Sequence, residues 1–343
     1  MSDISLHDQL NNERAPFTAV PAETITEWEP GTFVENLAPF PPGGWLVTVP
    51  SHRRIDLVTG DGRRSTFAEL ASTPTGIVTD GDGAWVISGT IGEPGWCLNR
   101  VRQGDVARAC DLPQLRFGNG MARDGRRLLI ADSALGIVLA VDLDARRAAQ
   151  WIHHELFAPL EQAVGVPGIN GITVAGDHVF LTNTARALLL RVPAAATDTT
   201  HLEIVAERLF ADDFAVHDDG TLYLATHMFD SVLRLAPDGR RTEIARADQG
   251  VETSTSVAID PEDPDTLWVT AAGERFGSGG HGKPARLIRL RAKPPTTSAD
   301  HAARGAAAQP GRGTRPRRAR RSPCPRVRGA ARGQPQGPQD LGA

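Results

Sequence analysis

Short apolar runs recur along the chain at near-equal spacing, and each opens with a polar residue and leads into an acidic or glycine turn. The steps between the six leading residues are 40, 44, 51, 43 and 42 residues, which is the length of one four-stranded propeller blade. No long stretch has helical periodicity, apart from a possible turn near Leu156–Val164. The pattern predicts an all-β, six-bladed β-propeller. Its leading residues are Glu35, Thr75, Asn119, Asn170, Asp213 and Thr255.

A second strand with an aliphatic or aromatic centre follows each leading segment. Glycine, aspartate or both lie just ahead of most of these strands, which is typical of hairpin turns between short antiparallel strands. The turn pattern therefore predicts that consecutive strands pair within one blade. The predicted second strands span residues 45–49, 84–88, 128–131, 179–183, 222–226 and 267–271.

The sixth blade has only three predicted strands before the chain changes composition. Ala22–Trp28 resembles the outer strands of the other blades, so we expect it to complete the sixth blade and close the ring. Residues 1–20 are predicted to be a flexible N-terminus and residues 21–291 the propeller. Residues 292–343, rich in Arg, Pro and Ala, have too few large apolar side chains to form a core and are predicted to be disordered.

Composition indicates an ordinary soluble protein, with 40% hydrophobic and 23% charged residues among 343. The net charge of −4 conceals a split, because residues 292–343 carry +9 and the remainder −13. An Arg-rich tail could bind nucleic acid, but this one lacks interleaved aromatic residues, so no nucleic-acid partner is expected.

The sequence pattern predicts neither a secretory signal nor a membrane helix. The N-terminus has no apolar leader, and no stretch approaches the ~20 apolar residues of a membrane helix. The three cysteines have no metal-ligand spacing and are expected to be thiols in a reducing compartment. We therefore expect a cytoplasmic monomer without a membrane partner.

The leading residues carry the candidate chemistry, because the strands that begin propeller blades line the central channel. Glu35, Asn119, Asn170 and Asp213 would then converge on one axis. Carboxylate and amide oxygens are ligands of hard divalent cations, Ca²⁺ above all, with Zn²⁺, Mn²⁺ or Mg²⁺ as alternatives. An Asn-Gly pair in isolation would be a turn, but recurrence at one position of the repeat favours a metal site. Four protein ligands leave room for water or substrate, and Asp213 or Glu35 could act as general base or nucleophile.

These segments resemble a known family. The residues around Glu35, Gly118–Gly120, Pro167–Gly171 and Asp213 look like those of the senescence marker protein/gluconolactonase family of six-bladed propellers, which shares its architecture with the squid-type diisopropyl-fluorophosphatases. The resemblance covers roughly residues 20–291. It implies that Glu35, Asn170 and Asp213 ligate a metal, with Asn119 as a further ligand or substrate contact. It also implies that Asp213 is the base or nucleophile in hydrolysis of a lactone or related ester.

Loops on the face where the inner strands begin should hold the substrate. His227 and Arg186 can bind an anionic or oxyanionic group, and His52 lies in an equivalent loop. Residues 155–168 and 273–284 could overhang the channel as lids. The expected function is a Ca²⁺-dependent hydrolase that acts on a small-molecule lactone or ester. The alternative is a non-catalytic propeller that binds a small ligand or protein and uses its channel metal only structurally.

Overall fold

The computed structural model describes residues 14–163, 165–273 and 282–292. Contacts divide the chain into Met1–Pro295 and Thr296–Ala343, and all described residues lie in the first unit. The predictions for residues 1–13, for the tail beyond residue 292 and for most of the 273–284 segment therefore fall outside the described residues. Within the described ranges, no helix is long and apolar enough to cross a membrane. Cys97 and Cys110 are free thiols, and Cys324 lies outside these ranges.

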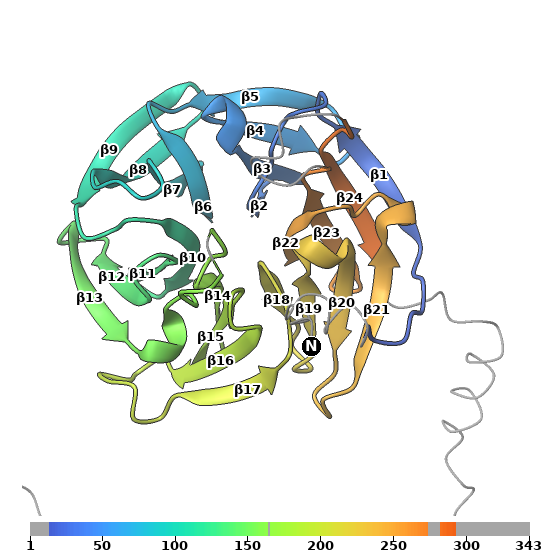
Figure 1. Cartoon of the computed structure of the whole chain (residues 1–343). Coiled ribbons are helices and arrows are strands. Elements are labelled where there is room, and N and C mark those ends of the chain that lie inside the picture. The colour runs from blue at the N-terminus through green and yellow to red at the C-terminus, as the bar shows by residue number, and fades with distance from the viewer. Residues whose placement is uncertain (1–13, 164, 274–281, 293–343) are drawn as a thin grey trace, which may run out of the picture. The chain divides into compact units, whose positions relative to one another are not determined.

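Six four-stranded antiparallel sheets surround a central axis, as Figure 1 shows, and the predicted six-bladed β-propeller is confirmed. In the first five blades the strands follow chain order from the axis outward. Blades one to three comprise β2 (Leu37–Phe40), β3 (Gly44–Val49), β4 (Arg54–Thr59) and β5 (Arg64–Glu69); β6 (Thr73–Asp80), β7 (Gly83–Gly89), β8 (Trp96–Arg102) and β9 (Asp105–Leu112); and β10 (Gly118–Asp124), β11 (Arg127–Asp132), β12 (Ile137–Asp142) and β13 (Arg147–His153). Blades four and five comprise β14 (Ile169–Ala175), β15 (His178–Asn183), β16 (Leu188–Pro193) and β17 (Glu203–Glu207); and β18 (Phe214–Val216), β19 (Leu222–Ala225), β20 (Ser231–Leu235) and β21 (Arg241–Arg246).

The sixth blade is completed by the N-terminal strand, as predicted. Its sheet has the order β1 (Ala22–Glu27), β24 (Arg286–Arg291), β23 (Thr266–Ala271) and β22 (Ser254–Ile259). Strand β1 pairs with β24 from Ala22 opposite Leu290 to Glu27 opposite Arg286. The next residue, Trp28, is 2% exposed, and its indole Nε1 donates to Asp56 Oδ2 of blade one over 2.8 Å. This contact ties the closing strand to the blade beside it.

Residues 14–20 are ordered along β21, although the sequence pattern places them in a flexible N-terminus. The amides of Thr18 and Val20 donate to the carbonyl oxygens of Glu243 and Ile244, each over 2.9 Å. The Glu243 amide donates to the Pro16 carbonyl oxygen over 2.9 Å, so the pairing is reciprocal. An outer strand offers unpaired backbone groups along its edge, and this segment uses those of β21.

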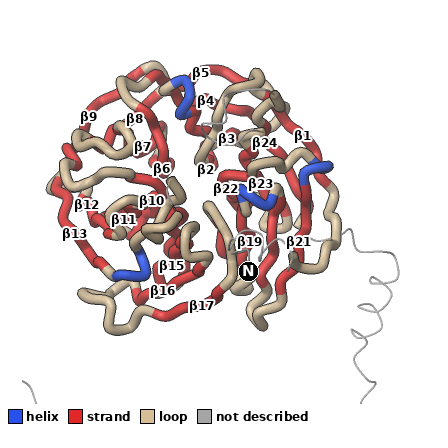
Figure 2. The backbone as a smooth tube through the Cα atoms, in the orientation of Figure 1, coloured by secondary structure: helices blue, strands red, loops and turns tan. Residues whose placement is uncertain are grey.

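Helical structure among the described residues is confined to short 3₁₀ turns on the connections, as the blue segments of Figure 2 show. Apolar side chains of neighbouring blades pack against one another, and the second strands supply much of this core. Strand β3 is buried at every position, for example. The turns are η1 (Pro50–His52), η2 (Glu155–Phe157), η3 (His227–Phe229) and η4 (Ala247–Gln249).

Candidate functional site at the start of the inner strands

Strand register identifies the equivalent position in each blade. In every blade, one apolar residue of the first strand pairs with a residue at the equivalent place in the second strand. The residue two positions before it in the sequence is the leading residue of that blade. These apolar residues are Leu37, Ile77, Met121, Ile172, Phe214 and Val257, paired with Val47, Val86, Ile130, Leu181, Leu224 and Val269. The leading residues are therefore Glu35, Thr75, Asn119, Asn170, Asp212 and Thr255. Five match the prediction, and in blade five the position belongs to Asp212 rather than Asp213.

Hydrogen bonds between blades support this assignment independently. The Thr182 hydroxyl of blade four donates to the backbone oxygen of Asp212 over 2.7 Å. The Thr270 hydroxyl of blade six donates in the same way to the backbone oxygen of Glu35 over 2.8 Å. Asp212 thus has the backbone environment of Glu35, the other acidic leading residue.

Asp213 occupies the next position, which is glycine in three blades. A Cβ atom on Gly76 or Gly120 would lie 2.4 Å from a backbone oxygen of the next blade. A Cβ atom on Gly171 would lie 2.6 Å from Asp213 Oδ1. The glycines therefore let the inner strands approach closely, and Gly171 makes room for the Asp213 carboxyl group. Gly120 and Gly171 lie within strands β10 and β14, not in turns.

The two leading asparagines are buried and hold their amide groups in fixed directions. Asn119 Nδ2 donates to Ser133 Oγ over 3.1 Å. Asn170 Nδ2 donates to Thr184 Oγ1 over 3.1 Å and also to Asp212 Oδ1. Among the described residues, no hydrogen bond reaches either amide oxygen, so both oxygens are available as ligands.

Three carboxyl groups interact electrostatically at this site. Burial, followed by the charges of Asp212 and Asp213, raises the pKa of Glu35 well above its ordinary value. Burial also raises the pKa of Asp213 to about 7, against the opposing hydrogen bond from the Ser256 hydroxyl to its Oδ2. Concentrated negative charge of this kind disfavours ionisation unless a cation compensates it.

The donor chemistry suits a hard divalent cation, although the carboxyl groups alone do not form a cluster. Among the described residues, no three His, Cys, Asp or Glu side chains are gathered closely enough to hold an ion. The candidate set instead combines the carboxylates of Glu35 and Asp212 with the unbonded amide oxygens of Asn119 and Asn170. A mixed set of oxygen ligands with open places is what Ca²⁺ accepts. The residues therefore fit such an ion.

The six leading residues are called the ring from here on. His227 is the predicted rim residue that reaches this ring, at Asp212. Its Nδ1 lies 3.1 Å from Asp212 Oδ2, and its side chain is 19% exposed. The pair is close enough for an ion pair, yet Nδ1 is buried without a well-aligned hydrogen bond. His227 also begins η3 with a φ of 41°, a left-handed conformation that is uncommon outside glycine. Strained residues of this kind concentrate at functional sites.

The other predicted substrate contacts lie on equivalent connections but serve different local contacts. His52 ends η1, is exposed, and has Nδ1 3.0 Å from Ser51 Oγ. Arg186 Nε donates to the Ala158 backbone oxygen over 2.9 Å. Within the described ranges, neither side chain has a hydrogen bond or ion pair to a leading residue. Their substrate-binding roles stay predictions.

The first half of the predicted lid at 155–168 is fastened to the blade beneath it. Phe157 is fully buried. Asn183 Nδ2 donates to the backbone oxygens of Leu156 and Phe157, over 2.8 and 3.2 Å. Together with the Arg186 contact to Ala158, these bonds fix the turn η2 in place.

A cavity of about 290 Å³ continues from the ring along the inner strands. Asn36 and Asp213, the residues after two leading positions, lie at one end of it, and Val216 and Ile259 lie at the ends of their strands. Its lining is otherwise mainly apolar. Asp213 therefore faces the channel interior, whereas Asp212 contacts His227 on the rim.

The sequence pattern did not identify Asp212, because Asp212 and Asp213 are adjacent and either could be the leading residue of blade five. The repeat itself carried the signal. Asn170-Gly171-Ile172 aligns with Asp212-Asp213-Phe214 once the apolar residue is taken as the reference. Ser256, at the position after Thr255, was also missed and bonds Asp213.

These pKa directions predict how the stability of the cation-free protein depends on pH. The folded-state pKa of Asp213, about 7, exceeds its ordinary value near 4. Between these values the folded state binds more protons at this group, so the stability that Asp213 contributes is fully present below about pH 4 and is lost as the pH rises through 7. In chelator, Asp213→Asn should flatten the pH dependence of the free energy of unfolding by up to about 1.4 kcal/mol per pH unit between pH 4 and 7, as measured by denaturant unfolding.

The matched control is Asp238→Asn. Asp238 is exposed, and the hydrogen bond from Arg240 lowers its pKa, whereas burial raises that of Asp213. Because the charge of Asp213 also raises the pKa of Glu35, the difference from wild type reports Asp213 together with its effect on Glu35. A wild-type protein and an Asp213→Asn variant with parallel pH profiles would contradict the assignment. Excess Ca²⁺ should raise wild-type stability most at high pH, where the carboxyl groups are ionised.

Comparison with known proteins places the fold. No protein-family profile and no curated protein sequence matches the chain. Among solved structures, the calcium-binding protein regucalcin of Agrobacterium tumefaciens is 16% identical, with a TM-score of 0.61 over 82% of this chain and 98% of its own. A gluconolactonase of Xanthomonas campestris is 12% identical, with a TM-score of 0.59 over 81% and 91%.

A protein named as a lyase is also among the similar structures. Virginiamycin B lyase of Staphylococcus aureus is 12% identical, with a TM-score of 0.53 over 75% of this chain and 80% of its own. At such identities similarity establishes the fold, and the activity must be argued from the site. The structures similar to this chain include a gluconolactonase and a regucalcin, which fits the family indicated by its sequence, and what they establish is the six-bladed β-propeller fold.

Proposed function

We propose that this protein is a metal-dependent hydrolase that opens a lactone or related ester. The observation that supports this proposal most directly is that Glu35, Asn119, Asn170 and Asp212 occupy equivalent positions of their blades. These side chains would hold a divalent cation of the Ca²⁺ type, with Zn²⁺, Mn²⁺ or Mg²⁺ as alternatives. When bound, such a cation supplies Lewis acidity toward a carbonyl oxygen. The similarity to a gluconolactonase and a calcium-binding regucalcin is consistent with this chemistry.

Asp213 is the residue that we propose for proton transfer. Burial raises its pKa to about 7 in the cation-free protein, and a cation bound nearby would lower that pKa, so that the carboxyl group would be ionised at neutral pH as a general base must be. The Ser256 hydroxyl bonds one carboxyl oxygen, and the missing side chain of Gly171 leaves space for the other. Asp213 would take a proton from a water molecule while the water oxygen adds to the carbonyl carbon of the lactone. It would then give this proton to the ring oxygen of the lactone as the bond between that oxygen and the carbonyl carbon breaks. Direct attack by the carboxylate is the alternative.

The rim would orient the substrate. His227 lies against Asp212 and can contact a substrate oxygen and the ring at once. Arg186 and His52 lie on the equivalent connections of two other blades, β15–β16 and β3–β4. We propose that they bind hydroxyl or anionic groups farther from the reacting carbonyl, with Asn119 as a second contact nearer to it. Three statements remain predictions from the sequence: the small-molecule partner, the monomeric state and the cytoplasmic location.

A second role has one observation in its favour. The backbone of the ring takes part in bonds between blades, such as those from Thr255 and Thr270 to the Glu35 oxygen. A cation in the ring could therefore staple the inner strands of a non-catalytic propeller. In that case its removal would lower stability while no hydrolysis would be observed at any metal concentration.

The decisive experiment combines metal removal with an activity panel. Protein treated with chelator and then reloaded with Ca²⁺, Mn²⁺, Mg²⁺ or Zn²⁺ is assayed on sugar lactones, aryl esters and phosphotriesters. We expect hydrolysis of at least one lactone that is lost on chelation and restored by one ion. A protein that gains thermal stability from an ion but hydrolyses no substrate would contradict the enzyme and favour the structural role.

A further inference from the structure

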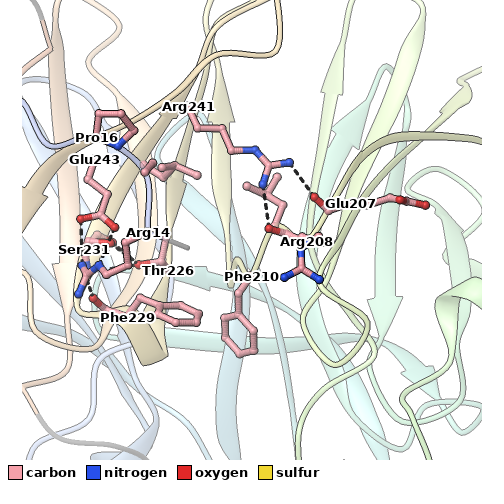
Figure 3. A pocket seen from close by; sticks show the side chains of 13 residues that line it. Arg14, Pro16, Glu207, Arg208, Phe210, Thr226, Phe229, Ser231, Arg241 and Glu243 are labelled. Carbon is pink, nitrogen blue, oxygen red and sulfur yellow. Dashed lines mark hydrogen bonds and ion pairs between the residues drawn. The ribbon is translucent and has the colours of Figure 1, made fainter. Parts of the chain in front are cut away.

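A second cleft, which shares no lining residue with the cavity on the inner strands, lies between the end of blade four and blade five, and Figure 3 shows the side chains that line it. Its volume is about 430 Å³, within the size range of small-molecule sites. One wall is formed by Glu207, the last residue of β17, and by residues 208–210. The other is formed by blade five and by Arg14–Pro16 of the N-terminal segment.

Glu243, on the blade-five wall, has its charge compensated within that wall. Arg14 donates to both carboxylate oxygens of Glu243, over 2.7 Å from Nε and 3.0 Å from a terminal nitrogen. Glu243 is 4% exposed and also accepts from Arg246 over 2.5 Å. Glu243 is therefore fully engaged by two guanidinium groups on its own side of the cleft.

A second cation of blade five, Arg241 at the start of β21, lacks such compensation among the described residues and reaches across the cleft to the opposite wall. Arg241 donates to the backbone oxygens of Arg208 and Glu207, over 2.8 and 2.6 Å. Within the described ranges no carboxylate forms an ion pair with Arg241. Figure 3 shows the Glu207 carboxyl group directed away from it. Burial and the nearby charge of Arg208 lower the pKa of Arg241, as expected for a guanidinium beside a like charge.

Aromatic side chains lie beside this charge. Phe210 and Phe229 come from the two walls and meet edge to face, with ring centroids 5.4 Å apart. Leu209 and Leu233 are buried next to them. The cleft thus combines an apolar surface with donors of fixed direction, which is the usual composition of a site for an organic ligand.

We propose that this cleft binds an organic carboxylate whose apolar part is about the size of an aromatic ring. The planar guanidinium of Arg241 spends two N–H groups on backbone oxygens and keeps others for a carboxylate, to which its geometry is matched. The two phenylalanine rings would contact the apolar part. This site goes beyond the proposed hydrolase and does not depend on it.

The test is a calorimetric titration with benzoate, carried out in chelator so that no channel metal can bind the carboxylate. Benzoate should bind saturably, with a Kd on the order of 1 mM for a ligand of this size. Benzamide, the neutral analogue, should bind at least about tenfold more weakly, as should benzoate to Arg241→Gln, because a charge-assisted hydrogen bond is lost. Arg240→Gln is the matched control: Arg240 is adjacent in sequence and pairs with Asp238 instead of lining the cleft. It should bind benzoate as wild type does.

Two further measurements test the proposal even if Arg241→Gln does not fold. They are the binding of benzoate to Phe210→Ala and the binding of inorganic phosphate. Phe210→Ala should weaken benzoate binding but leave the weaker binding of inorganic phosphate unchanged, because phosphate lacks an apolar part. Phosphate binding as tight as that of benzoate would overturn the organic half of the proposal. Equal binding of benzamide and benzoate, equal losses in the Arg240 and Arg241 variants, or no saturable binding of benzoate would overturn the site.

Discussion

Asp212→Asn is expected to weaken Ca²⁺ binding by about 10- to 100-fold while leaving the propeller folded. The substitution keeps an oxygen that can accept the hydrogen bond from Asn170 Nδ2, but it removes one of the two negative charges among the proposed ligands. Calcium affinity depends on the number of charged ligands and on the groups that orient them. Calorimetric titration of the metal-free variant measures the loss.

The neighbouring carboxyl groups provide the controls for this result. Asp218→Asn makes the same change on an exposed turn and should leave calcium affinity unchanged. Asp213→Asn should cost less affinity than Asp212→Asn, because Asp213 contributes charge near the ion but is not placed among its ligands. If Asp213→Asn abolishes metal binding and Asp212→Asn does not, the leading residue of blade five is Asp213 and our register assignment is wrong.

Asp213→Asn is expected to lower turnover of a lactone substrate by about 10²–10⁴-fold with the metal site saturated. A carboxamide has nearly the same shape as a carboxylic acid and can still accept the hydrogen bond from the Ser256 hydroxyl. It cannot take a proton from water or attack a carbonyl group. Steady-state kinetics at increasing Ca²⁺ separate this loss from any loss of metal occupancy.

Ser256→Ala tests the environment of the same group without removing it. The Ser256 hydrogen bond opposes the effect of burial, so its loss should raise the pKa of Asp213 and shift the acidic limb of the pH–rate profile upward. Near wild-type turnover of Asp213→Asn at saturating Ca²⁺ would show that Asp213 is not the base. Proton transfer would then fall to Glu35, to His227 or to metal-bound water.

Much of the fold could be predicted from the sequence because a propeller repeats one local unit. Each blade is built from short strands and tight turns whose apolar pattern depends on neighbouring residues. The spacing of the leading residues therefore predicted six blades, and the strand-like segment Ala22–Trp28 predicted the closure by β1. Glu35, Asn119 and Asn170 were assigned to the leading position by the same reasoning, because no second carboxylate stands next to any of them.

What only the tertiary structure decided depends on contacts between segments far apart in the chain. A register shift of one residue turns a side chain to the other face of a strand, and local pattern cannot choose between Asp212 and Asp213. The bonds from Thr182 of blade four and from Asn170 to Asp212 make that choice. The pairing of residues 14–20 with β21, and the cleft that Arg14 helps to close, were also invisible in the sequence. The periodicity by itself determined the number of blades and the ring of polar residues. Contacts between blades decided which carboxylate faces which partner, because that choice depends on the three-dimensional register of the strands.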